Sequence, residues 1–263
     1  MSIVSPSWLG LLYAAMPIML AMVLLAIRGL GQVFPLMIAL VRLVVQLILL
    51  GYVLQWLFST DQPAIVGMIA LVMLLVSAYT VGDRLPRSGW SLRIESFVSL
   101  LIVTSLVMAV ALRLGLRNEP WYAPRVVIPL LGMVLGNSVS SVALAAERFE
   151  SELRADRDLV ELRLALGATS RQAALPALRA AVRAALTPPI NNMSIAGIVS
   201  IPGMTTGQLL AGANVSDAIR YQILVYLAMT ATITLSTLIL LGFRLRRYFT
   251  VDAQLRGEML DGG

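Results

Sequence analysis

The sequence predicts an all-α, polytopic integral membrane protein with about seven transmembrane helices. Apolar residues make up 59% of the 263 residues and charged residues only 13%, whereas soluble domains carry about 25% charged residues. The mean hydropathy is +0.86. Apolar runs also recur at lengths close to the roughly 20 residues that span a bilayer.

The basic residues are all Arg, and the chain contains no Lys, His or Cys. A G-x-x-x-x-G-K-[ST] nucleotide loop therefore cannot form, and Ser–His, thiolate and ordinary zinc chemistry are excluded. We expect no enzymatic activity from a chain with so few side chains that can act as nucleophiles, bases or metal ligands. The high pI of about 10.3 reflects Arg clusters beside apolar runs, as the positive-inside bias requires, and we expect no nucleic-acid partner.

Seven apolar runs are expected to form one transmembrane domain covering 1–263. The predicted spans are 9–27, 36–58, 64–81, 94–112, 126–145, 177–203 and 217–243. Arg is concentrated in the loop 82–93 and in 244–247, which marks both segments as cytosolic. The N-terminus is therefore expected outside and the C-terminus in the cytosol, although the loop 113–125, with three Arg and one Glu, departs from the bias.

The first two predicted spans differ in polar content. Pro17 lies inside the first and is expected to kink it. In the second, Arg42 and Gln46 stand four residues apart and share a helix face. A charge in a span usually points toward protein or water, but Arg42 also lies near enough to the start of the span to reach the headgroups. Both interpretations stay open.

The middle of the chain alternates between external and membrane segments. Asp61, in a turn without Arg, marks the turn 59–63 as external. In the fifth span, Gly132 and Gly136 have the spacing that favours close helix packing. The amide of Asn137 needs hydrogen-bonding partners, so it is expected to face protein or water.

A polar region, 147–176, follows the fifth span and is expected to be cytosolic. Good helix formers predict one helix over 150–166, which Gly167 ends. Thr169 and Gln172 fit a capping box at the start of a new helix. Pro176 limits that helix to about two turns.

The sixth span is predicted to be discontinuous. Pro188 and Pro189 interrupt helical hydrogen bonding beside Asn191 and Asn192. Irregular backbone at membrane depth is tolerated mainly beside protein or a water-filled cavity. A second break is expected at 200–204, and the loop that follows it lacks Arg and is expected outside.

Several motifs together resemble the FetB-type ABC-transporter permeases. Glu161, followed by an Ala/Leu-rich turn and Gly167-Ala-Thr169, is similar to the coupling helix of ABC permeases. The other motifs are Arg42-x-x-x-Gln46-Leu with Gly51-Tyr52 and Phe58, Ile128-Pro129-x-x-Gly132-Met133-x-x-x-Asn137, Ile201-Pro202-Gly203-Met204-x-x-Gly207, and Tyr221-Gln222. Pro176 lies nine residues after Gly167, earlier than in the importer permeases.

The resemblance implies a permease subunit that exports metal ions, iron in particular, from the cytosol. It implies a homodimer in the lipid bilayer of the bacterial inner membrane, with two copies of a cytosolic ABC ATPase subunit docked on a coupling helix between spans five and six. The chain itself is expected to bind no cofactor, since ATP and Mg²⁺ belong to the ATPase. FetB-type permeases include iron exporters of enteric bacteria, and plant relatives are linked to aluminium tolerance.

Two sets of candidate site residues follow. ATPase coupling is assigned to Glu161, Leu166, Gly167, Ala168, Thr169, Ser170 and Arg171. The substrate pathway is assigned to Arg42, Gln46, Met133, Asn137, Ser138, Asn191, Asn192, Pro202 and Met204. The interiors of the predicted spans hold no His, Cys, Asp or Glu, so a metal site there would depend on weaker amide, hydroxyl and thioether ligands.

Two other functions stay open on the sequence. A discontinuous sixth span suits an ATP-independent secondary transporter or channel equally well. An ABC exporter could also carry an organic cargo.

Overall fold

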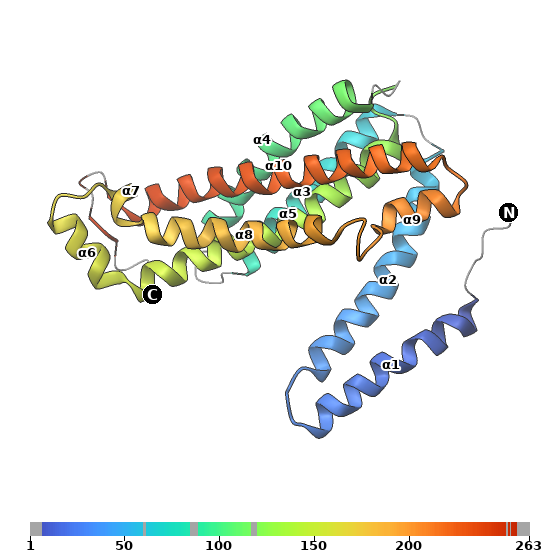
Figure 1. The fold of residues 1–263 in the computed structure, drawn as a ribbon, viewed down its shortest axis with the longest axis horizontal. Helices are drawn as coiled ribbons and strands as arrows, with labels where there is room; N and C mark the ends of the chain where they lie inside the picture. The colour runs from blue at the N-terminus through green and yellow to red at the C-terminus, as the bar shows by residue number, and fades with distance from the viewer. Residues whose placement is uncertain are drawn as a thin grey trace. The chain divides into compact units, whose positions relative to one another are not determined.

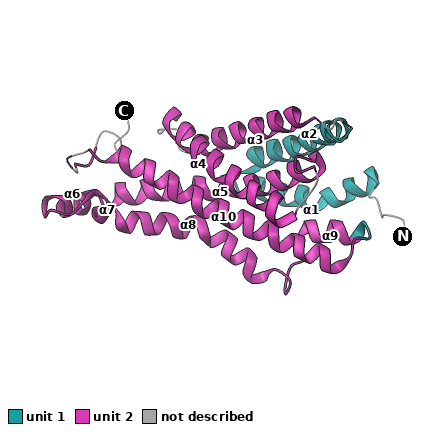
Figure 2. Cartoon of the chain, turned by 90° about the horizontal axis from the view of Figure 1, so that it is seen from above, with its two compact units in different colours: residues 1–61, 210–212 teal, residues 62–209, 213–263 magenta. Residues whose placement is uncertain are grey.

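The computed structural model describes residues 7–59, 62–84, 89–116, 120–250, 252 and 254–256. Within these ranges the chain is helical, with two isolated β-bridges and no strand. The chain divides into two compact units, residues 1–61 with 210–212 and residues 62–209 with 213–263 (Figure 2). The predicted all-α class is confirmed.

Unit 1 contains two apolar helices, α1 (Trp8–Ile27) and α2 (Val33–Leu57) (Figure 1). The Ser7 hydroxyl caps α1 by accepting a hydrogen bond from the N–H of Gly10 at 3.1 Å. At the other end Gly29, with φ of 62°, lets the chain leave the helix in the left-handed region. Neither helix is buried along its apolar window, which suits contact with lipid.

Unit 2 holds the remaining helices, apart from the last residue of α9. They are α3 (Pro63–Asp83), α4 (Gly89–Val110) continued by the π-helical η2 (Ala111–Leu116), α5 (Pro124–Ala155), α6 (Arg157–Ala165), α7 (Ser170–Ala173), α8 (Leu175–Ile195), α9 (Gly203–Leu210) and α10 (Val215–Tyr248) (Figure 1). Helix α5 packs against α3, α4, α8 and α10. It is therefore the centre of the unit.

Within the described ranges, six helices are long and apolar enough to cross a membrane: Trp8–Ile27, Val33–Leu57, Pro63–Asp83, Trp90–Leu116, Pro124–Ala155 and Val215–Tyr248. The protein is therefore a multi-pass membrane protein. Helix α8 has 21 residues but is not among the six, so the count of seven spans stays a prediction, as does the single-domain organisation. Four charged residues of the loops that were assigned above to one side of the membrane lie outside the described residues: Asp61, Arg87, Arg117 and Glu119.

Helix α8 packs through small side chains. Ala177, Ala181, Ala185 and Pro189 are buried at every fourth position, which places them on one face. That face lies against α5 and α10, and small residues let helix backbones approach closely. A Cβ at Gly136 would meet no atom of the described residues within 4 Å, so the close packing predicted there stays a prediction.

Two sequence-based predictions about helix breaks are wrong. The helix expected over 150–166 is interrupted, because α5 ends at Ala155 and α6 begins at Arg157. The turn between them directs α6 so that Val160 packs in the same core as Leu153. Helix α8 continues through Pro188 and Pro189 to Ile195, because packing of the buried Pro189 face compensates for the lost hydrogen bonds. The break expected near 200–204 is present, since residues 196–202 are not helical.

The α5–α8 contact makes a testable prediction about stability. Ala181 is fully buried, so Ala181→Leu should overpack the contact and lower the free energy of unfolding by about 1–3 kcal/mol. The neighbouring Ala180 lines an open groove, and Ala180→Leu should leave the melting temperature of the purified protein in detergent nearly unchanged. Equal losses in the two variants would contradict this packing.

Candidate functional site

A polar pocket of about 180 Å³ lies where α5, α8 and α10 meet. We call it the asparagine pocket, after Asn137 of α5 and Asn192 of α8. Its other lining residues are Gly136, Ser140, Ser141, Leu144, Pro188, Pro189, Met229 and Ile233. The Asn137 side chain donates from Nδ2 to the carbonyl oxygen of Met133 at 2.8 Å. Its amide oxygen accepts no hydrogen bond from the described residues, so it is available to a ligand.

The pocket opens on an exposed polar face. Gly136, Asn137, Ser140 and Asn192 are all exposed. Asn137 stands 13 residues from the start of α5, or about 20 Å along the helix, which is well inside a hydrocarbon core of about 30 Å. Amide groups at that depth cannot face lipid without a large cost. This face must therefore meet other protein or water.

The predicted pathway residues are only partly brought together. Asn137 and Asn192 share the pocket, and Met133 lies one turn from Asn137. Ser138 is buried elsewhere and donates to the carbonyl oxygen of Val134 at 2.7 Å. Asn191 is exposed on α8 and does not line the pocket, Pro202 directly precedes α9, and Met204 lies in the first turn of α9. Arg42 and Gln46 belong to unit 1, where they are exposed on α2.

The predicted coupling residues form a sharply defined turn between α6 and α7. Gly167 has φ of +88°, and the N–H groups of Gly167 and Ala168 donate to the carbonyls of Leu164 and Arg163. These two bonds are the Schellman motif that ends a helix. Thr169 and Gln172 form the predicted capping box, with both reciprocal bonds present. We call residues 157–173 the α6–α7 elbow.

The elbow is fixed to the transmembrane helices. Arg163 donates from Nη1 to the carbonyl oxygen of Ala173 at 3.2 Å, which joins α6 to the end of α7. Val160 and Ala173 are buried in one apolar core with Phe149 of α5 and Tyr248 of α10. The elbow therefore shares one packed core with α5, α8 and α10.

The outer face of the elbow carries an exposed leucine stripe. Leu159, Leu162 and Leu166 follow each other at i, i+3 and i+7, which places them on one side of α6, and they are 42%, 55% and 79% exposed. Leu166 is among the predicted coupling residues; Leu159 and Leu162 were missed, although their helical spacing was a usable signal. Glu161 pairs with Arg157 of the same helix at 3.0 Å.

A buried ionic network, which we call the Arg244 network, joins three helices. Arg244 of α10 is only 1% exposed and lies 3.3 Å from Glu150 of α5 and 3.5 Å from Glu95 of α4. It also donates to the hydroxyl of Tyr248 at 2.8 Å. The sequence indicated only a cytosolic Arg cluster at 244–247, because the carboxylate partners lie far away in the chain. Arg154 and Arg247 add outer pairs to Glu150 and Glu95.

Carboxylates do not form a metal site in the part of the chain that the structure describes. No group of three or more His, Cys, Asp or Glu there is placed to hold a metal ion. The asparagine pocket offers amide oxygens, serine hydroxyls and the thioether of Met229 instead. Such ligands bind hard and borderline cations weakly.

The model of the uncharacterised protein family UPF0014 matches residues 8–249. The chain belongs to the UPF0014 family. A UPF0014 membrane protein of Synechocystis is 39% identical over 94% of this chain and 93% of its own length. The protein named "Probable iron export permease protein FetB" of Escherichia coli is 31% identical over 81% of each chain.

A plant relative is about as similar to the chain as the Escherichia coli protein is. The protein named "ALUMINUM SENSITIVE 3" of Arabidopsis thaliana is 32% identical over 82% of this chain and 77% of its own length. No solved structure matches the chain. The relatives therefore identify a family of membrane proteins that includes a named permease.

The Arg244 network makes a prediction about stability. Arg244→Met leaves Glu95 and Glu150 without their buried partner, which should cost about 3–5 kcal/mol. The melting temperature in detergent should fall accordingly, and adding Glu95→Gln and Glu150→Gln to the same variant should restore part of it. Arg246→Met, at an exposed position two residues away, should change the stability by less than about 0.5 kcal/mol. A normal melting temperature for Arg244→Met alone would contradict the network.

Proposed function

We propose that this UPF0014 protein is the permease subunit of an ABC transporter that exports metal ions, iron first among them, from the cytosol. Two copies of the chain form the pathway in the bacterial inner membrane, and two copies of a separate cytosolic ATPase supply the energy. The chain contributes no enzymatic activity, and ATP with Mg²⁺ binds to the ATPase. The observation that carries the proposal is the exposed leucine stripe on an elbow that is packed onto the pathway helices.

The leucine stripe is the docking surface for the ATPase. It lies in the polar region between α5 and α8, which the positive-inside bias assigns to the cytosol. Leucines exposed at i, i+3 and i+7 are the pattern by which an amphipathic helix seats in an apolar groove of a partner. The missing nucleotide loop in this chain is consistent with an ATPase on a second polypeptide.

Movement of the ATPase reaches the pathway through α8 and α10. The core that holds Val160 and Ala173 of the elbow extends along α8 to Ala185 and along α10 to Met229. Met229 also lines the asparagine pocket. A displacement of the elbow therefore changes the geometry of the pocket without needing a flexible linker.

Homodimer formation covers the polar face of α5 and α8. Gly136, Asn137, Ser140 and Asn192 are exposed, and they stand at a depth where lipid is an unsuitable neighbour. Two copies facing each other would enclose these residues in a shared polar pathway. The C-terminus then lies in the cytosol and the N-terminus lies outside, as the Arg distribution favours.

The cargo is a metal cation held weakly in transit. The name of the Escherichia coli relative supports iron. The amide and hydroxyl oxygens of the asparagine pocket, doubled by the second copy, provide neutral ligands that release a cation readily. An exporter requires release as much as binding.

Docking is tested by co-purification of the chain with its cognate ATPase. Leu162→Ser combined with Leu166→Ser removes the two most exposed leucines of the stripe, and it should weaken the complex by at least about tenfold. Because both side chains are exposed, the melting temperature of the isolated chain should not change.

Asp158→Ser on the same helix is the matched control. It is exposed but does not belong to the stripe, so binding of the ATPase should remain near the wild-type value. If the double leucine variant retains the ATPase as tightly as Asp158→Ser does, the docking proposal fails.

The cargo pathway is tested in a strain that lacks the gene and carries variant copies. Asn137→Ala and Asn192→Ala each remove an amide from the pocket, so cells should return toward the iron sensitivity of the deletion strain. Ser194→Ala is the control, because its exposed hydroxyl donates to the carbonyl of Ile190 and does not line the pocket. Full iron tolerance with both asparagine variants would exclude the pocket from the pathway.

A further inference from the structure

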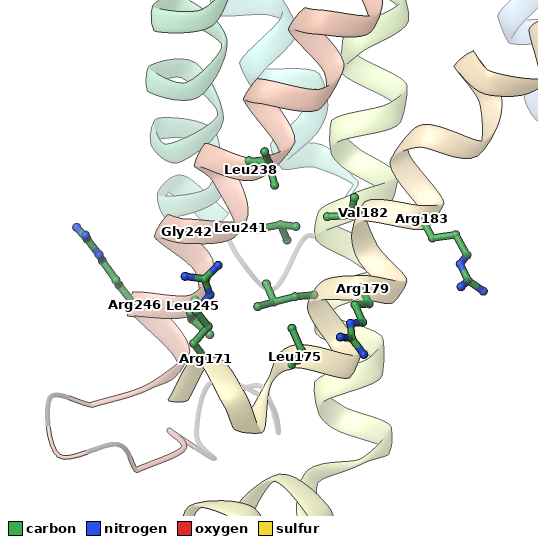
Figure 3. Close-up of a pocket in the computed structure, with 11 residues that line it drawn as sticks. Arg171, Leu175, Arg179, Val182, Arg183, Leu238, Leu241, Gly242, Leu245 and Arg246 are labelled. Carbon is green, nitrogen blue, oxygen red and sulfur yellow. The ribbon is translucent and has the colours of Figure 1, made fainter. Parts of the chain in front are cut away.

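A second cavity lies between α8 and α10, separate from the asparagine pocket and from the leucine stripe (Figure 3). We call it the leucine–arginine groove; its volume is about 650 Å³. Leu175, Leu178 and Val182 of α8 form one wall, and Leu238 and Leu245 of α10 form the other. Figure 3 shows Leu238, Leu241 and Val182 directed into the space between the helices. The interior of the groove is therefore apolar.

The edges of the groove are basic. Arg171 of α7 and Arg246 of α10 lie toward the end opposite Leu238 (Figure 3). Arg179 and Arg183 of α8 complete the lining, and Arg183 extends away from α10. All four are exposed, and none forms an ion pair with a residue that the structure describes. The uncompensated positive charge favours an anionic ligand.

The apolar wall and the basic end lie at different depths. Leu238 and Arg246 are eight residues apart on α10, or about 12 Å along the helix. Helix α10 has no charged residue from Tyr221 to Phe243 and then ends in Arg244, Arg246 and Arg247, the arrangement of a helix that leaves the bilayer on the cytosolic side. The groove therefore passes from the hydrocarbon into the headgroup region.

We propose that the leucine–arginine groove binds an anionic phospholipid of the cytosolic leaflet. Its phosphate lies near Arg171, at the end of the groove that the exposed Arg246 also lines, and one acyl chain lies along the leucines of α8 and α10. Basic pockets between membrane helices on the cytosolic side are suited to such headgroups. A soluble protein segment fits less well, because the apolar wall lies at hydrocarbon depth, and a free phosphate would leave that wall uncovered. The membrane orientation is the one inferred under Proposed function.

The bound lipid joins three elements that the proposed coupling uses. The groove is lined by α7, α8 and α10, so a lipid in it bridges the end of the elbow to α10. Lipid occupancy would then favour the arrangement of the elbow described above. The headgroup composition of the membrane becomes a regulator of the transporter.

Gly242 provides a direct way to fill the groove. It is exposed on the groove side of α10, and a Cβ there would meet no atom within 4 Å. Gly242→Leu should therefore fold normally while its side chain occupies the acyl-chain space. Gly242→Ala is the matched control, because a single methyl group leaves most of that space open.

The experiment is native mass spectrometry of the full chain in neutral detergent, titrated with phosphatidylglycerol or with phosphatidylcholine of the same chain length. Phosphatidylglycerol should bind the wild type about tenfold more tightly than phosphatidylcholine, or about 1.4 kcal/mol. Gly242→Leu should remove most of the binding of phosphatidylglycerol, and Gly242→Ala should retain it. Arg246→Gln should reduce the preference for the anionic lipid, whereas Arg220→Gln, at the opposite end of α10, should not.

Four outcomes would overturn the proposal. They are equal binding of the two lipids, unchanged binding in Gly242→Leu, complete displacement by inorganic phosphate, and dissociation of a dimer by Gly242→Leu, which would assign the groove to a second copy. The experiment contains neither ATPase nor metal, so its failure is separate from failure of the proposed export function.

Discussion

The ionic network around the buried guanidinium of Arg244 is the interaction on which the packing of unit 2 next to the elbow depends. A buried charge is tolerated only when it is paired and hydrogen-bonded, and here Glu95, Glu150 and Tyr248 supply the partners. The network fixes α4, α5 and α10 relative to one another at the end where the elbow is attached. The ring of Tyr248 also packs edge to face on the ring of Phe149, with the two ring centroids 6.1 Å apart. The ionic network therefore continues into the apolar core of the elbow.

The position of this network bears on how the elbow would transmit force in the proposed coupling. A cytosolic loop held only by its two chain connections would absorb a push from a partner protein. Here Val160 and Ala173 are buried in the core that extends along α8, and α8 contributes Asn192 to the asparagine pocket. The proposed docking surface and the pocket therefore belong to one packed body, which is the physical basis of the proposed coupling.

Local signals in the sequence predicted the membrane class, the end of α6 at Gly167 and the capping box at Thr169 correctly. Each depends on residues close together in the chain: the length of an apolar run, a glycine in the left-handed region, or a hydroxyl three residues before a glutamine. The asparagine pair was also identifiable, because amides in apolar runs are costly without partners.

The features that sequence reasoning missed depend on distant residues. Continuation of α8 through Pro188 and Pro189 follows from packing against α5, which outweighs the local cost of proline. The partners of Arg244 lie 94 and 149 residues away in the chain, and no local pattern indicates such pairs. The same limit applies to the leucine–arginine groove, whose two walls come from α8 and α10.

The central claim is that ATP hydrolysis by a docked partner moves a cation through a pathway formed by this chain. The direct measurement is iron flux in proteoliposomes that contain the chain with or without its cognate ATPase. Flux should require both the ATPase and hydrolysable ATP, and it should be lost when Leu162 and Leu166 are both replaced by Ser. Iron flux through the chain alone, driven by an ion gradient and independent of ATP, would contradict the account.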